Sequence, residues 1–157
     1  MVTYQIIASI VCLILTVLYF VRFGIKHKVL PPSLSETSYI TGKYWFMGYC
    51  MSLLLLMPPM FDIVPVNLQF CVFLMFVGLM MAGISPLFRE TIEGKVHNIS
   101  AIIAFVGFLI YACIDLEWWL QLIYFGAVFA LTKYRPQSFV LFAEIMVVIT
   151  LCIRMLI

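Results

Sequence analysis

Long apolar stretches of roughly twenty residues dominate this chain of 157 residues and leave little sequence between them. A helix needs about 20 mainly apolar residues to cross the hydrocarbon core of a bilayer. Apolar residues make up 66% of the chain and charged residues only 10%, against roughly 45–50% and about 25% in soluble proteins. A water-soluble fold of this length has too little interior to hide that surface. The sequence therefore predicts an integral membrane protein with no soluble domain.

The fold class that follows is all-α: a polytopic transmembrane helical bundle of about six helices in a single transmembrane domain, residues 1–157. The helices are expected at about 2–23, 44–60, 68–88, 98–114, 118–132 and 138–157. The second is expected to stop at Pro58-Pro59, because proline lacks a backbone N–H. The fourth is expected to begin near Asn98, a favourable N-cap residue. The fourth and fifth are short, so a four-span bundle with a re-entrant hairpin is an alternative.

The basic residues predict the orientation of the bundle. They lie in or beside the loops after the first, third and fifth helices, and the other two loops carry only acids. The basic residues are Arg22, Lys26, Lys28, Lys43, Arg89, Lys95, Lys133 and Arg135, with Arg154 as the one exception; the acids are Asp62, Asp115 and Glu117. Because cytoplasmic loops are enriched in Lys and Arg, both termini are expected to be extracytoplasmic. The expected location is a bacterial cytoplasmic (inner) membrane.

Glu144 is the first candidate site residue, because it interrupts the apolar run 139–149 of the sixth helix. It is expected on the order of 10 Å below the cytoplasmic end of that helix. A carboxylate within a membrane helix costs about 2.5–3.5 kcal/mol, so it should face a partner or a wet cavity. Glu144 therefore indicates either an ion, proton or headgroup site, or a hydrogen-bonded residue that locks helix packing.

Two further candidates belong to the same expected leaflet. His97, at the cytoplasmic end of the fourth helix, is either an acid–base group or an interfacial cap. Arg89, at the end of the third helix, can extend to a lipid phosphate, or it belongs to a solvated loop. Helix packing is expected from Gly78 and Ala82, which form a small-x-x-x-small pair.

The first polar loop supplies the last two candidates, Glu36 and Tyr39. Ser33 and Glu36 match the S-x-x-E capping box, so a helix is expected to start at Ser33 and lead into the second span, with a bend at Gly42. Glu36 and Tyr39 then lie at the level of the cytoplasmic headgroups. The five cysteines fall within apolar runs and are expected to be small buried hydrophobes, and no metal or cofactor is expected.

Two short segments, Pro32–Tyr39 and Glu93–His97, resemble patterns in small, uncharacterised bacterial and phage-encoded multi-helix membrane proteins. The helix count and the Val96-His97-Asn98 start of the fourth helix are also similar to the six-helix DRAM/Sfk group. That group usually has a larger first outer loop than this chain. The resemblance implies a bundle with a cytoplasmic site and carries no assigned activity.

The leading hypothesis is a small membrane protein that binds or translocates an ion, a small solute or a lipid. Its site would lie on the cytoplasmic side, built from Glu144, His97, Arg89, Glu36 and Tyr39. One alternative is a structural or interaction subunit of an oligomeric complex or pore. A second is a membrane-embedded lipid-acting enzyme with His97 as the base. The expected partners are the bilayer, a small ligand or lipid and a second copy of the chain; the net charge of +2 does not suggest nucleic acid.

Overall fold

The structure is a computed structural model that describes residues 2–26, 30–88 and 90–157, and within those ranges it is helical and contains no strand. Helices suit lipid because each one satisfies its own backbone hydrogen bonds. Among the described residues, five segments are long and apolar enough to cross a membrane: Thr3–Ile25, Lys43–Ile63, Val66–Leu87, Gly94–Ile114 and Pro136–Leu156. The predicted all-helical transmembrane character is confirmed.

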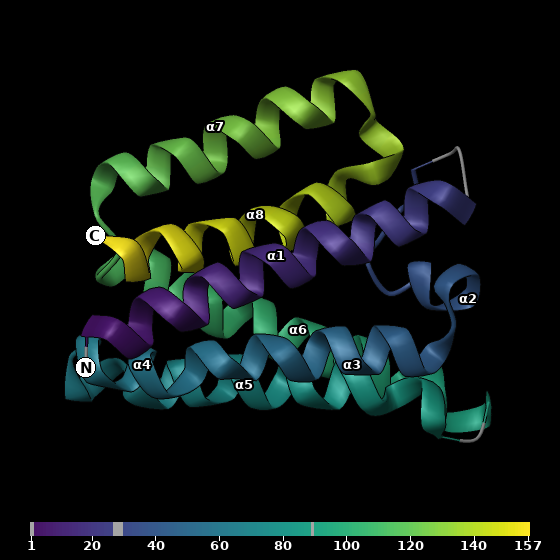
Figure 1. Ribbon diagram of the computed structural model, residues 1–157, viewed down its shortest axis with the longest axis horizontal. Helices are drawn as coiled ribbons and strands as arrows, with labels where there is room; N and C mark the ends of the chain where they lie inside the picture. The colour runs from purple at the N-terminus through teal and green to yellow at the C-terminus, as the bar shows by residue number, and fades with distance from the viewer. Residues whose placement is uncertain (1, 27–29, 89) are drawn as a thin grey trace.

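Three of the helices form one side of the bundle. Helix α1 (Val2–Lys26) packs against α8 (Phe139–Leu156), which in turn packs against α7 (Trp118–Tyr134), as Figure 1 shows. A 3-10 turn, Pro136–Ser138, precedes α8. Helix α7 has 17 residues and lies on the outside of the bundle. It corresponds to the expected fifth helix.

The second expected helix does not stop at Pro58-Pro59, so that prediction was wrong. The chain runs through α3 (Lys43–Leu53), a 3-10 turn (Leu54–Leu56) and α4 (Met57–Ile63). Both prolines lie in the first turn of α4, where a missing N–H breaks no helical hydrogen bond. The prolines therefore mark the start of a new helical segment, and the helical stretch ends at Ile63, two residues before Pro65.

The fourth expected helix begins well before Asn98, so this prediction was also wrong. Helix α5 (Gln69–Ile84) is followed by the 3-10 turn Ser85–Leu87, and α6 spans Glu90–Ile114. Residues 90–97, expected as a polar loop, form the first turns of α6, because a helix needs only its own backbone to satisfy its hydrogen bonds. With 25 residues, α6 is long enough to span. The four-span alternative depended on the fourth and fifth helices both being short, and only the fifth, with 17 residues, is short in the structure.

Helices α5 and α6 pack closely against each other, and two glycines permit it. A Cβ atom at Gly78 would lie 2.6 Å from the backbone nitrogen of Ala104 and 2.6 Å from the carbonyl oxygen of Ser100. A Cβ atom at Gly107 would lie 2.7 Å from the carbonyl oxygen of Cys71. The close packing expected of Gly78 is present, and Gly107 serves the same contact from the other helix.

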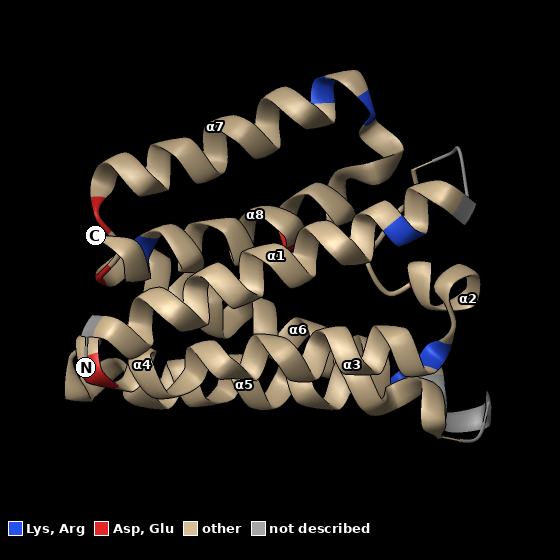
Figure 2. Cartoon of the chain, in the orientation of Figure 1, with Lys and Arg blue, Asp and Glu red and all other residues tan. Residues whose placement is uncertain are grey.

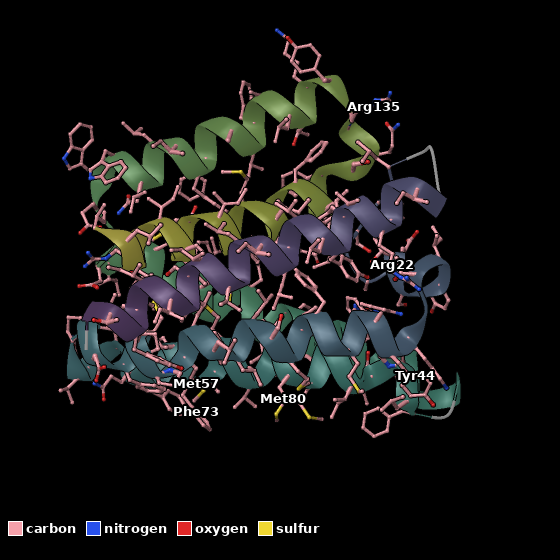
Figure 3. All side chains as sticks on the ribbon, in the orientation of Figure 1. Arg22, Tyr44, Met57, Phe73, Met80 and Arg135 are labelled. Carbon is pink, nitrogen blue, oxygen red and sulfur yellow. The ribbon has the colours of Figure 1, made fainter. Side chains whose placement is uncertain are left out.

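Lipid-facing side chains cover the outside of the bundle. Figure 3 shows Phe73 and Met80 of α5 pointing away from the other helices, and Phe73 is 43% exposed. Val17 on α1 and Phe129 on α7 are also exposed. Apolar side chains exposed along every long helix are expected when the solvent is hydrocarbon.

Charge separates between the two ends of the bundle (Figure 2). We call the end where α1 and α7 finish and α3 begins the basic end; its described Lys and Arg residues are Arg22, Lys43, Lys95, Lys133 and Arg135. The opposite, acidic end carries Asp62, Asp115 and Glu117, and both termini lie there (Figure 1). Arg154, the exception in the sequence, has its partner at this end: its Nη1 donates to Glu117 Oε1 at 2.7 Å.

Replacing Gly78 by alanine will weaken the contact between α5 and α6. The added methyl group meets two backbone atoms that cannot move aside, and overpacking of this kind costs about 1–3 kcal/mol. The matched control is Gly126→Ala on α7, where nothing lies within 4 Å of the new Cβ. That variant should gain about 0.5–1 kcal/mol from reduced backbone freedom. The free energies of unfolding of both variants can be measured in detergent, with circular dichroism as the probe of unfolding. Equal stability of the two variants would contradict the close packing.

Candidate functional site

Residues 30–42, which precede α3, lie across the basic end of the bundle. After a turn at residues 32–36 the chain forms α2 (Thr37–Thr41). The helix therefore begins at Thr37 and not at Ser33, and the predicted capping box is wrong: Glu36 makes no side-chain cap bond, and Ser33 Oγ lies 3.0 Å from Ser35 Oγ. The expected bend at Gly42 is confirmed by its φ of +102°, a left-handed conformation that favours glycine.

Two hydrogen bonds fasten this segment to α8. The backbone N–H of Leu34 donates to Glu144 Oε2 at 2.7 Å. The backbone N–H of Leu141 donates to the carbonyl oxygen of Pro32 at 3.0 Å. Both bonds join residues more than a hundred positions apart in the sequence. They hold residues 32–36 beside the first turns of α8.

A hydroxyl network fastens α2 on its other side. The Tyr19 hydroxyl of α1 is hydrogen-bonded to the hydroxyls of Thr37 and Thr41. The ring of Tyr19 stacks on Tyr49 of α3 at 4.5 Å between centroids, and Tyr49 in turn lies 3.3 Å, hydroxyl to hydroxyl, from Thr16. Since Tyr19, Thr37 and Thr41 are all buried, α2 is a fixed wall of the bundle.

A cavity of about 460 Å³ lies behind this wall, and we call it the polar cavity. The α2 segment, the end of α5, the first turns of α6 and the start of α8 form its lining. Its lining residues are Ser33, Ser35, Glu36, Ser38, Tyr39, Ser85, Pro86, Gly94, His97, Asn98, Ala101, Val140 and Glu144. The structure thus brings together Glu36, Tyr39, His97 and Glu144 of the expected site. Arg89, the fifth residue, lies outside the described residues.

A second cavity, of about 340 Å³, continues from the first toward the middle of the bundle. We call it the apolar cavity, because its walls are the apolar side chains of α3, α5, α6 and α8, such as Phe76 and Leu151. The two cavities share the lining residues Ser35, His97, Ala101, Val140 and Glu144. His97 and Glu144 therefore stand at the junction between a polar and an apolar space.

The apolar cavity is half open to the outside of the bundle, and its lining includes exposed side chains of α6 and α8. Ile102 and Val106 of α6 line it and are 62% and 47% exposed on the bundle surface. Phe139 and Val140 of α8 line it and are each 49% exposed. These four side chains therefore stand at an opening of the apolar cavity toward the surrounding lipid.

Ser85 is a member of the site that the sequence analysis missed. Its hydroxyl donates to the carbonyl oxygen of Ala82 at 2.7 Å, and the same oxygen lies 3.0 Å from His97 Nδ1. It is fully buried in the turn that ends α5 and lines the polar cavity. The one signal in the sequence was a hydroxyl beside Pro86 at the end of an apolar run.

Glu36 and Tyr39 stand at the mouth of the polar cavity, where Tyr39 is 80% exposed, whereas Glu144 is half-buried at its base. Cys12, Cys50 and Cys152 are buried as expected, but Cys113 is exposed to the outside of the bundle.

Comparison of the chain with protein families, with curated proteins and with solved structures finds no match. The chemistry of the site is therefore argued from these residues alone.

Replacing Glu144 by alanine will release residues 34–41 from α8. The N–H of Leu34 loses its acceptor, and a buried donor without a partner costs about 1–3 kcal/mol. Glu144→Gln keeps a side-chain carbonyl for the same N–H and should be closer to wild type. Amide hydrogen exchange of Leu34 and of α2 measures the release. Glu36→Ala, at an exposed position, is the control; unchanged exchange in Glu144→Ala would show that the segment is held without this bond.

Proposed function

We propose that this protein binds a single amphiphile from the membrane, with the polar end of the ligand in the polar cavity and its apolar chain in the apolar cavity. The observation that carries the proposal is the junction of two cavities of opposite character at His97 and Glu144. Both volumes fall within the range of about 300–1,000 Å³ that is usual for small-molecule sites. A molecule with one polar and one apolar part matches both spaces at once.

An ion or a small polar solute accounts for only one of the two cavities. It would occupy the polar cavity and leave the apolar cavity empty. The side chains around an empty apolar space, Phe76 and Leu151 among them, lose the dispersion contacts that a filled space provides. A hydrocarbon chain restores those contacts, so the geometry favours an amphiphile over an ion.

The bilayer itself is the source of such a ligand. Ile102, Val106, Phe139 and Val140 line the apolar cavity where it opens to the outside of the bundle. A ligand that enters beside these side chains keeps its chain in hydrocarbon throughout. We therefore propose entry between α6 and α8, with no passage through water.

For the orientation, we propose that the basic end faces the cytoplasm and that both termini lie outside, in a bacterial cytoplasmic membrane. The separation of Lys and Arg from the acidic end supports this through the positive-inside rule. It requires α7 to be a sixth span. Its 17 residues extend about 25 Å at ~1.5 Å per residue, at the short end of the spanning range. The polar cavity then lies at the cytoplasmic headgroups.

Reporter fusions will test this orientation in cells. Alkaline phosphatase fused after Ile157 should be active, because the enzyme folds only outside the cytoplasm. Green fluorescent protein fused after Gln137, behind α7, should fluoresce, because it folds only inside. The reciprocal fusions should be silent. The opposite pattern, or phosphatase activity at both positions, would show that α7 does not cross as proposed.

Filling the junction of the cavities will remove the bound amphiphile. Ala101 lines both cavities, so the phenyl ring of Ala101→Phe would occupy the space that the ligand needs. Ala130→Phe adds the same ring at an exposed position of α7 and is the matched control. Native mass spectrometry after incubation with a total membrane lipid extract should show an amphiphile adduct on wild type and on Ala130→Phe. Loss of the adduct in Ala101→Phe supports the proposal. If wild type carries no adduct, or if Ala101→Phe retains it, the proposal is wrong.

A further inference from the structure

The described lining of the two cavities contains carboxylates and no cationic side chain. Glu36 and Glu144 line the polar cavity, and none of the Lys and Arg residues that the structure describes lines either space. Within the described ranges the one ion pair is Arg154–Glu117, at the opposite end of the bundle. Glu144 lies on a membrane-spanning segment, where a carboxylate is costly unless charge or several donors balance it.

The hydrogen bond from Leu34 uses only part of the acceptor capacity of Glu144. The Leu34 nitrogen lies 2.7 Å from Oε2, within the usual range for an N–H donor to oxygen. That N–H is one donor, whereas the two oxygens of a carboxyl group can accept several hydrogen bonds. Glu144 therefore has unused acceptor capacity where the two cavities meet.

The hydrogen bond to Ser85 determines which ring nitrogen of His97 can accept a hydrogen bond from a ligand at the junction of the two cavities. A serine hydroxyl has a single proton, and the 2.7 Å bond to the carbonyl oxygen of Ala82 uses it. The Ser85 oxygen must then accept from His97, so we assign the proton of the neutral imidazole to Nδ1. The other ring nitrogen, Nε2, is left as an acceptor. His97 and Glu144 both line the junction, and each has an acceptor atom that a ligand donor could use.

Building on the proposed function, we propose that the amphiphile is a single-chain amine, whose protonated amino group donates to Glu144 and to His97 Nε2. An ammonium group brings both the donors and the positive charge that the described lining lacks. A phosphate headgroup would bring its negative charge against Glu36 and Glu144, which is unfavourable in a space of low dielectric constant. At about 340 Å³ the apolar cavity is near the lower limit of ligand sites, which suits one hydrocarbon chain better than two.

Three probes with the same chain and different polar ends test the headgroup: dodecylamine, dodecanol and dodecyl phosphate. Each is titrated against the full-length protein in phosphatidylcholine nanodiscs, with binding corrected for partition into empty nanodiscs. In wild type the amine should bind roughly tenfold or more tightly than the other two. In Glu144→Gln, which keeps a carbonyl for Leu34, this preference should disappear. Glu36→Gln, at the exposed mouth, should change it less.

The binding results distinguish a failure of the amine proposal from a failure of the amphiphile site itself. Dodecyl phosphate or dodecanol binding as tightly as the amine in wild type would overturn the amine, while the amphiphile site stands if Ala101→Phe abolishes binding of each probe. Failure of all three probes to bind wild type would overturn both. An amine preference that survives Glu144→Gln would also overturn the inference, because it would place the amino group elsewhere.

Discussion

The hydrogen bond from the Leu34 N–H to Glu144 determines the shape of the basic end of this bundle. It turns a connecting segment, which would otherwise extend into water, into a wall that lies across α8. The bond from Leu141 to Pro32 and the hydroxyls around Tyr19 complete the attachment. That wall forms one side of the polar cavity, so His97 and Glu144 border a space with polar walls on one side and apolar walls on the other.

The sequence left two interpretations of Glu144 open, a ligand site and a residue that locks helix packing, and the structure is compatible with both. One carboxylate oxygen accepts from the backbone of Leu34, which is the packing role. The same side chain lines both cavities, which is the placement that a ligand site requires. The cost of a carboxylate inside a membrane helix correctly indicated that it would have a partner. It could not indicate a backbone amide of the first loop as that partner, because that contact depends on the tertiary fold.

The helices were predictable because length and hydropathy decide them in lipid, but their boundaries were not. Pro58 and Pro59 were treated as a stop, although prolines are tolerated in a first turn and begin α4. The polar residues before Asn98 were treated as a loop and begin α6. Grouping Glu36, Tyr39, His97 and Glu144 followed from their shared leaflet, and all four line one cavity. Ser85 was missed because its role depends on the distance to His97, which no local pattern encodes.

The opening of the apolar cavity beside Ile102, Val106, Phe139 and Val140 affects what determines the affinity for a ligand. A site reached through lipid equilibrates with the mole fraction of ligand in the leaflet, not with its concentration in water. A hydrocarbon chain already buried in the bilayer gains little hydrophobic free energy by moving into an apolar cavity. Discrimination among single-chain ligands then depends on the polar end, and the occupancy of the site reports the composition of the membrane around it.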